Sequence, residues 1–278
     1  MEKTFDANGP VRVDVELASG EISVDPTATG VATVELVAHD EASQEQVDAA
    51  RVELRGQDLI VHVPNRRGGF SIGNLFGGRG ITCRIRCPEG SSVKTRTKSA
   101  DVSVLWTIAD ADISTASGDA RLADVTGNLS FKGASGDLTA GNVGGRASAN
   151  TASGDIQVGS VAGHVSANSA SGDISVESAG GDTKANTASG DVVLEAVVTG
   201  DVTVNSASGD VRIGIRRGSR AYLDCSTVSG DTTSELDVTG EEPAGDGPLV
   251  NVKARTVSGD ITITRAPAPA QHAEEVQA

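Results

Sequence analysis

The sequence predicts an all-β fold: a single-stranded β-helix, or β-solenoid, with coils of about 18 residues and a strand-rich N-terminal cap. Three observations predict it. A Ser-Gly-Asp triplet recurs eight times, the residues after each triplet alternate between apolar and polar types, and the 278 residues include 34 glycines but only six aromatic residues. Six rings are too few for an ordinary globular core. Small aliphatic side chains stacked coil on coil can build a core without them.

The triplet sets the period of the repeat. It stands at 117–119, 135–137, 153–155, 171–173, 189–191, 208–210, 229–231 and 258–260. The first five triplets are evenly spaced, whereas the last three follow at widening steps, which indicates insertions. Ser99-Ala100-Asp101 precedes the first triplet by one regular step, and Ser19-Gly20-Glu21 is a further echo. We expect successive repeats to stack as successive coils.

The pattern within each repeat predicts two short strands joined by two turns. Ile156-Gln157-Val158 after one triplet, and Val165-Ser166-Ala167 before the next, alternate with the period of a half-buried strand. We expect the triplet glycine to supply a corner with positive φ, which other residues resist. A flat meander is the alternative, but it would need a partner layer that this chain lacks. Stacked coils about 4.8 Å apart instead close a continuous core.

The chain divides into three parts. We expect residues 1–98 to form the strand-rich cap. Its expected strands lie at 11–17, 31–38, 52–54, 59–63 and 81–87, with a helix-compatible run at 39–50 and a glycine-rich loop at 65–80. Residues 99–265 predict the solenoid, with an acidic loop at 237–249. Residues 266–278 predict a disordered tail. A cap is expected because an open solenoid end invites edge pairing.

The net charge and the cysteines limit which ligands the chain can bind and in which compartment it works. With 23 basic and 38 acidic residues the net charge is −15, which argues against binding a nucleic-acid backbone. No apolar run approaches a transmembrane segment, and the N-terminus lacks the pattern of a signal peptide. Cys83, Cys87 and Cys225 cannot all pair within one chain, and free thiols are typical of a reducing compartment. We therefore expect a cytoplasmic protein.

Two features together indicate a family. Strands lead into a Cys-Pro-Glu-Gly turn at 87–90, and the Ala-Ser-Gly-Asp-(Ile/Val)-x-(Val/Ile) repeat follows. Over roughly residues 10–265 the chain resembles the bacterial putative-adhesin family, also called domain of unknown function 4097. The resemblance implies a right-handed β-helix-like fold and no established enzymatic activity, and it offers no catalytic residues to carry over.

The aspartates of the triplets form the first candidate site. They are Asp119, Asp137, Asp155, Asp173, Asp191, Asp210, Asp231 and Asp260. One interpretation is a structural turn, in which each carboxylate accepts backbone or hydroxyl hydrogen bonds. The other is a ladder of Ca²⁺ sites, because hard cations prefer carboxylate oxygens. Calcium-binding β-roll repeats carry Gly-Gly-x-Gly-x-Asp in both halves of the period, whereas this repeat has a single Gly-Asp per period. We therefore favour the turn and predict neither a metal nor a cofactor.

The glycine-rich loop is the second candidate site. It carries basic and apolar residues in an acidic chain: Arg66, Arg67, Phe70, Ile72, Leu75, Phe76 and Arg79. It matches no phosphate-binding motif, so we interpret it as a candidate partner-binding loop. A column of hydroxyl residues at Thr115, Thr151, Ser169, Thr187, Ser206, Thr227 and Thr256, with Asn150, Asn168, Asn186 and Asn205 beside it, predicts a polar ladder or a ligand-binding face.

The sequence favours binding over catalysis. The four histidines are scattered, and no nucleophile elbow or Walker motif is present. We expect a non-enzymatic interaction scaffold with a protein partner, and homo-oligomerisation stays open. The alternatives are an adhesin-like surface or Ca²⁺-binding protein, a β-helix carbohydrate-active enzyme working near Arg216, Arg217, Arg220 and Tyr222, and, least favoured, an acidic rod that mimics DNA.

Overall fold

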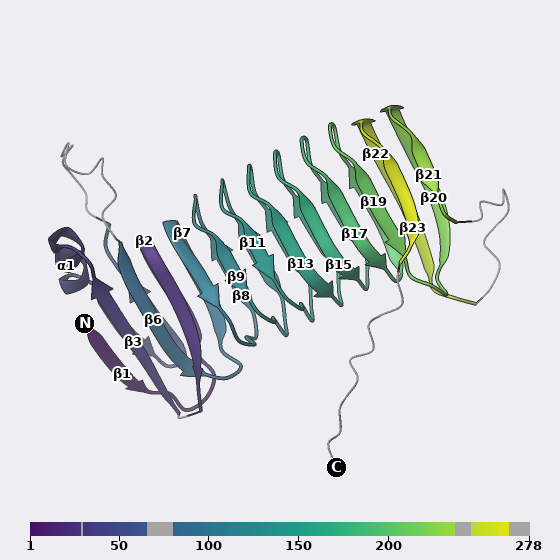
Figure 1. Ribbon diagram of the computed structural model, residues 1–278. Helices are drawn as coiled ribbons and strands as arrows, with labels where there is room; N and C mark the ends of the chain where they lie inside the picture. The colour runs from purple at the N-terminus through teal and green to yellow at the C-terminus, as the bar shows by residue number, and fades with distance from the viewer. Residues whose placement is uncertain (29, 66–79, 237–245, 267–278) are drawn as a thin grey trace, which may run out of the picture.

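A computed structural model gives the fold as an elongated solenoid built on one β-sheet of 23 strands, with a short helix at one end (Figure 1). The structure describes residues 1–28, 30–65, 80–236 and 246–266. The all-β solenoid predicted from the repeat is confirmed. Among the described residues, no helix is long and apolar enough to cross a bilayer.

The strands form two stacks that share the long strands β2 (Arg12–Thr27) and β7 (Ser92–Val104). In space, the first stack runs β4 (Arg51–Arg55), β5 (Asp58–His62), β2, β7, β8 (Ala111–Ser114), β10 (Leu129–Lys132), β12 (Ala147–Asn150), β14 (Val165–Asn168), β16 (Thr183–Asn186), β18 (Gly200–Asn205), β22 (Leu249–Ser258), β20 (Arg220–Ser229).

The second stack runs β1 (Glu2–Asp6), β3 (Val31–Ala38), β6 (Ile81–Pro88), β2, β7, β9 (Ala120–Leu122), β11 (Leu138–Ala140), β13 (Ile156–Val161), β15 (Ile174–Ala179), β17 (Val192–Val197), β19 (Val211–Ile215), β23 (Ile261–Arg265), β21 (Thr232–Ser234). From β2 onward both stacks are parallel, as expected of coils that repeat the same path.

The core lies between the two stacks and consists of aliphatic side chains in register. Ile156 of β13 stands beside Ile174 of β15, which stands beside Val192 of β17, and all three are fully buried. The intervening residues face solvent, so each short strand alternates buried and exposed positions. Phe131 is a fully buried ring in this core. Small residues thus suffice because every coil covers the next.

The N-terminal end departs from the regular coil. Strands β1, β3 and β4 pair antiparallel with their neighbours, and helix α1 (Glu41–Asp48) packs against β3 with Val47 buried. Asp40 begins the helix by accepting the Ser43 backbone N–H at 2.7 Å. The echo at Ser19-Gly20-Glu21 pairs directly with Ser99-Ala100-Asp101, so it belongs to the same corner column as the triplets. Residue 98 lies inside β7, which both stacks share.

The triplet glycines do not all have positive φ, and the expectation is wrong for the regular coils. Only Gly209, Gly230 and Gly259 have it, with φ of 149°, 152° and 143°. At Gly154, by contrast, a Cβ would collide with the carbonyl oxygen of Gly136 in the preceding coil. The other regular triplet glycines, 118, 136, 172 and 190, face the preceding coil in the same way. Glycine is needed there because two backbones approach closely at the corner.

The last two coils do not stack in chain order, which corrects the expectation that successive repeats always stack. Strand β22 lies between β18 and β20, and β23 lies between β19 and β21. The triplet at 258–260 therefore sits between those at 208–210 and 229–231 (Figure 1). The chain leaves a gap of one coil after β19, builds the terminal coil, and then fills the gap.

Candidate functional site

A groove of about 770 Å³ runs over the outward face of the first stack near its N-terminal end. Strands β5, β2, β7, β8 and β10 supply its floor and walls. The side chains reach it because alternate residues of a strand point to the same face. Its lining combines both charges, several polar residues and one larger apolar side chain: Arg12, Asp14, Asp58, Ile60, Ser92, Lys94, Asp110, Asp112, Asn128, Ser130 and Lys132, with Val13, Val93 and Ala111 beneath them.

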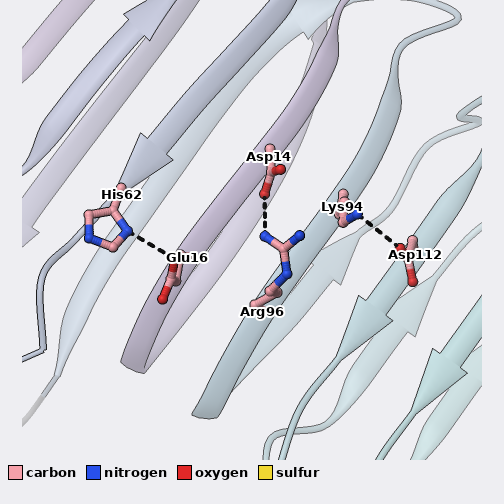
Figure 2. A network of polar contacts seen from close by, with 6 residues as sticks. All are labelled: Asp14, Glu16, His62, Lys94, Arg96 and Asp112. Carbon is pink, nitrogen blue, oxygen red and sulfur yellow. Dashed lines mark hydrogen bonds and ion pairs between the residues drawn. The ribbon is translucent and has the colours of Figure 1, made fainter.

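Ion pairs connect neighbouring strands on this face, and Figure 2 shows two of them, Asp14–Arg96 and Lys94–Asp112. Arg96 donates to Asp14 at 3.2 Å between β7 and β2, and Lys94 Nζ lies 3.5 Å from an Asp112 oxygen between β7 and β8. Arg12 contacts Asp58 at 2.6 Å between β2 and β5. Each of these pairs therefore joins opposite charges on two neighbouring strands.

A smaller hollow of about 340 Å³ adjoins the groove and shares Asp14 and Ile60 with it. His62 of β5 lies here, with Nδ1 2.9 Å from a carboxylate oxygen of Glu16 (Figure 2). Arg51 and Arg96 complete its charged lining. The two hollows make one continuous charged face across β4, β5, β2, β7, β8 and β10.

The side chains of these ion pairs are exposed to solvent, and this exposure limits how much each pair can stabilise the fold. The side chains of Lys94 and Asp112 are 44% and 49% exposed, so their attraction is largely screened by water. A pair of this kind stabilises a fold by at most about 1 kcal/mol. Its charges can consequently exchange partners with a charged ligand at little cost. The face is therefore suited to recognising a ligand that carries charges of both signs.

The triplet aspartates form a ladder along one corner of the solenoid. From Asp101 to Asp260, each Oδ1 accepts the backbone N–H of the aspartate in the next coil, at 2.8 to 3.1 Å. The spatial order of the ladder is Asp101, Asp119, Asp137, Asp155, Asp173, Asp191, Asp210, Asp260, Asp231. The geometry is that of a structural acceptor between coils. Within the described ranges, no group of three or more His, Cys, Asp or Glu side chains is arranged to hold a metal ion.

The hydroxyl column faces inward. Thr115, Ser169, Thr187, Ser206 and Thr256 are buried, and their hydroxyls bond to the triplet corners in most of these coils. Ser169, for example, accepts the Gly172 N–H and donates to the Gly154 carbonyl. Beside them, the side-chain amides of Asn150, Asn168, Asn186 and Asn205 bond to one another at 2.7 to 2.9 Å. These groups hold coils in register, and the idea of a ligand-binding hydroxyl face is wrong for the buried members.

The candidate loop residues Arg66, Arg67, Phe70, Ile72, Leu75, Phe76 and Arg79 lie outside the described residues. The tail at 266–278 lies outside them except for Ala266, which is buried and donates its N–H to the Ile215 carbonyl. In the last coils, Arg220 donates to the Gly247 carbonyl and Tyr222 is exposed.

The three cysteines are unpaired. Complete burial raises the pKa of the Cys83 thiol to about 12. Burial likewise raises the pKa of Cys87 to about 11, although a hydrogen bond with Ser91 opposes the shift. Thiols with a raised pKa are poor nucleophiles, so their surroundings are those of core residues.

Comparison with known proteins agrees with this architecture. The sequence model of the Toastrack DUF4097 family matches residues 11–264. The chain belongs to the Toastrack DUF4097 family. This confirms the resemblance drawn from the Cys-Pro-Glu-Gly turn and the triplet repeat. No curated protein matches this chain at a significant level.

Solved structures resemble this Toastrack domain at low identity. A putative adhesin from Bacteroides fragilis NCTC 9343 shares 10% identity with a TM-score of 0.53, covering 95% of this chain and 96% of that one. A putative adhesin from Parabacteroides distasonis ATCC 8503 shares 13% identity with a TM-score of 0.48 and the same coverages. At such identities the likeness to the first shows a common fold.

The charged face is the feature that sequence reasoning missed. A signal was present, because Arg12, Asp14 and Glu16 occupy alternate positions of one strand, and Lys94 and Arg96 do so in another. Their partnership was hidden, because β2 lies next to β7, which is distant from it in the sequence, rather than next to β3. Alternation predicts which residues face solvent but not which strands are neighbours.

Proposed function

We propose that this chain is a non-enzymatic β-solenoid that binds a protein partner in the charged groove over β5, β2, β7, β8 and β10. The observation that carries the proposal is the lining of the groove, which presents Lys94 and Arg12, Asp112 and Asp14, and the apolar Ile60 on one sheet face. Polypeptides carry cationic, anionic and apolar groups together, so they match such a lining better than a polymer of one charge.

Composition supports a protein over other ligands. The net charge of −15 opposes the approach of polyanions such as nucleic acids. Among the described residues, those that line the groove include no aromatic side chain on which a sugar could stack. The similar Bacteroides fragilis protein is described as a putative adhesin, which agrees with a role in binding.

The loop at 65–80 begins shortly after β5, a strand that lines the groove, and we propose that it assists in holding the partner.

Position-dependent photo-cross-linking in the native host tests the proposal. A photoreactive residue replaces Ile60 in the groove, or Thr139 on the outward face of the second stack as the matched control. We expect one discrete protein adduct from position 60 and none from position 139. Lys94→Glu, combined with the probe at position 60, should remove the adduct. Equal adducts from both positions, or none from position 60, would contradict the proposal.

A further inference from the structure

The C-terminal end of the solenoid differs from the rest because its last coil has a neighbour on one side only. Strand β20 pairs with β22 and β21 pairs with β23, and no other described strand pairs with either. The inward positions Ala221, Leu223 and Cys225 stand beside Val250, Val252 and Ala254. The latter three are fully buried, whereas the former three are only half-buried. This end therefore leaves both backbone groups and core side chains uncovered in the described structure.

Apolar side chains gather at this end. Among the described residues, six large apolar side chains are exposed, and four of them belong to β20 or β22: Tyr222, Val228, Leu249 and Val257. Val228 is 81% exposed and Tyr222 is 59% exposed. The regular coils carry alanine just before the triplet serine, and valine replaces it only at 228 and 257. The enlargement is thus confined to the two terminal coils in space.

The charges that protect sheet edges are unevenly distributed between the two ends. Charged side chains on an edge strand discourage pairing with another chain. At the N-terminal end, edge strands β1 and β4 each carry three charged residues in five. At the C-terminal end, β20 carries two in ten and β21 carries none. The segment 216–236, which forms the terminal coil, has three basic and three acidic residues in a chain of net charge −15. The terminal coil is thus neutral overall, so its own charges do not repel a second copy of this acidic chain.

We propose that β20 pairs antiparallel with β20 of a second copy, so that two solenoids join end to end across a two-fold axis. Opposed residues of an antiparallel pair lie on the same face. Inward residues must therefore meet inward residues. An axis through Asp224 would oppose two carboxylates. An axis through Cys225 instead places Tyr222 opposite Val228 of the second copy and Leu223 opposite Thr227.

The register centred on Cys225 brings together the apolar side chains that are exposed at this end. It brings the exposed aromatic ring of Tyr222 against the exposed β-branched Val228 twice, a favourable type of cross-strand pair. It also covers Leu223 and continues the core across the interface. This surface lies at the opposite end of the rod from the charged groove, so the dimer and the groove's partner do not compete (Figure 1).

Sedimentation equilibrium and oxidative cross-linking of the full chain test this proposal. We expect the wild type to sediment at twice the chain mass of 28.0 kDa. Val228→Lys should dissociate it, whereas Leu105→Lys, at an equally exposed apolar site away from this end, should not. Opposed residues of an antiparallel pair lie close enough for a disulfide. Copper phenanthroline should therefore yield a reducible dimer that Cys225→Ser abolishes.

The buried Cys83 and Cys87 serve as internal controls, because they cannot reach a second copy. A wild type that stays at 28.0 kDa at every concentration overturns the proposal, whether the end is bare or covered by the chain's own segments. A dimer that survives Val228→Lys, or one that does not cross-link through Cys225, overturns it as well.

Discussion

Aspartates of the triplets act as acceptors between coils. The carboxylate of Asp155 accepts the backbone N–H of Asp173 at 2.9 Å, and the backbone N–H of Asp155 donates to the Asp137 carboxylate. Without this acceptor, the N–H at each corner would lack a partner where the backbone turns away from the strands. The column of carboxylates therefore serves the stacking of coils, and its cost in charge repulsion is offset by one hydrogen bond per coil.

Removing one acceptor should weaken the solenoid measurably. We expect Asp155→Ala to lower the free energy of unfolding by about 1 kcal/mol, because the Asp173 N–H loses its partner. Asp155→Asn should cost less, since its amide oxygen can accept the same bond. Asp231 is the control: it stands at the end of the ladder, where no described N–H reaches its carboxylate. Urea unfolding that ranks Asp231→Ala as more damaging than Asp155→Ala would contradict this role.

The thiols report on the core. Because burial raises the pKa of Cys83 and Cys87, both should resist Ellman's reagent at pH 8 until the protein unfolds. Burial also raises the pKa of the half-buried Cys225, which should react slowly but first. Rapid reaction of all three in the folded protein would contradict a closed core.

The same thiols predict a loss of stability in alkali. Unfolding returns Cys83 and Cys87 to their ordinary pKa near 9, below their folded values. Their contribution to stability is therefore complete below about pH 9 and declines as the pH rises above it. Melting temperatures measured from pH 8 to pH 11 should fall more steeply for the wild type than for the Cys83→Ala, Cys87→Ala double variant. Parallel curves would contradict it.

At the level of elements, the helix depends on one carboxylate. Hydrogen bonds from the Ser43 backbone and side chain hold the pKa of Asp40 below its ordinary value. The cap is therefore fully effective above the ordinary pKa and is lost as the pH falls through the lower, folded pKa. Hydrogen exchange of α1 should accelerate at acidic pH, and Asp40→Ala should produce the same acceleration at pH 7. Equal protection of α1 in wild type and variant would contradict the cap.

Local elements could be predicted from the sequence where a pattern is local. The strand at Val31–Ala38 and the helix within 39–50 follow from alternation and polarity over a few residues. The triplet corners follow from repetition. The pairing of β2 with β5, β6 and β7 could not be predicted, because it depends on contacts between distant segments. The charged groove was missed for the same reason, since its residues come from five strands.

At the scale of the molecule, the solenoid has two unlike ends. Antiparallel strands and α1 close the N-terminal end, and the charged groove lies beside it. At the other end, the late strands β22 and β23 fill the gap left after β19. The widening spacing of the last triplets indicated that these coils are irregular, but it did not indicate the order in which they stack. Coils with the same pattern of residues can stack in either order. Length and repetition thus predicted the rod, while the arrangement of its ends depends on packing.

Binding of a protein in the groove is the central claim, and a charge swap tests it most directly. In the double variant Lys94→Asp, Asp112→Lys, the ion pair between β7 and β8 is reversed but kept. We expect its melting temperature to stay within about 2 °C of the wild type, because an exposed pair contributes little either way. Affinity for the partner identified by cross-linking should fall about tenfold, or ~1.4 kcal/mol. A swapped variant that binds the partner as tightly as the wild type would show that the pair serves only strand register, and would contradict the account.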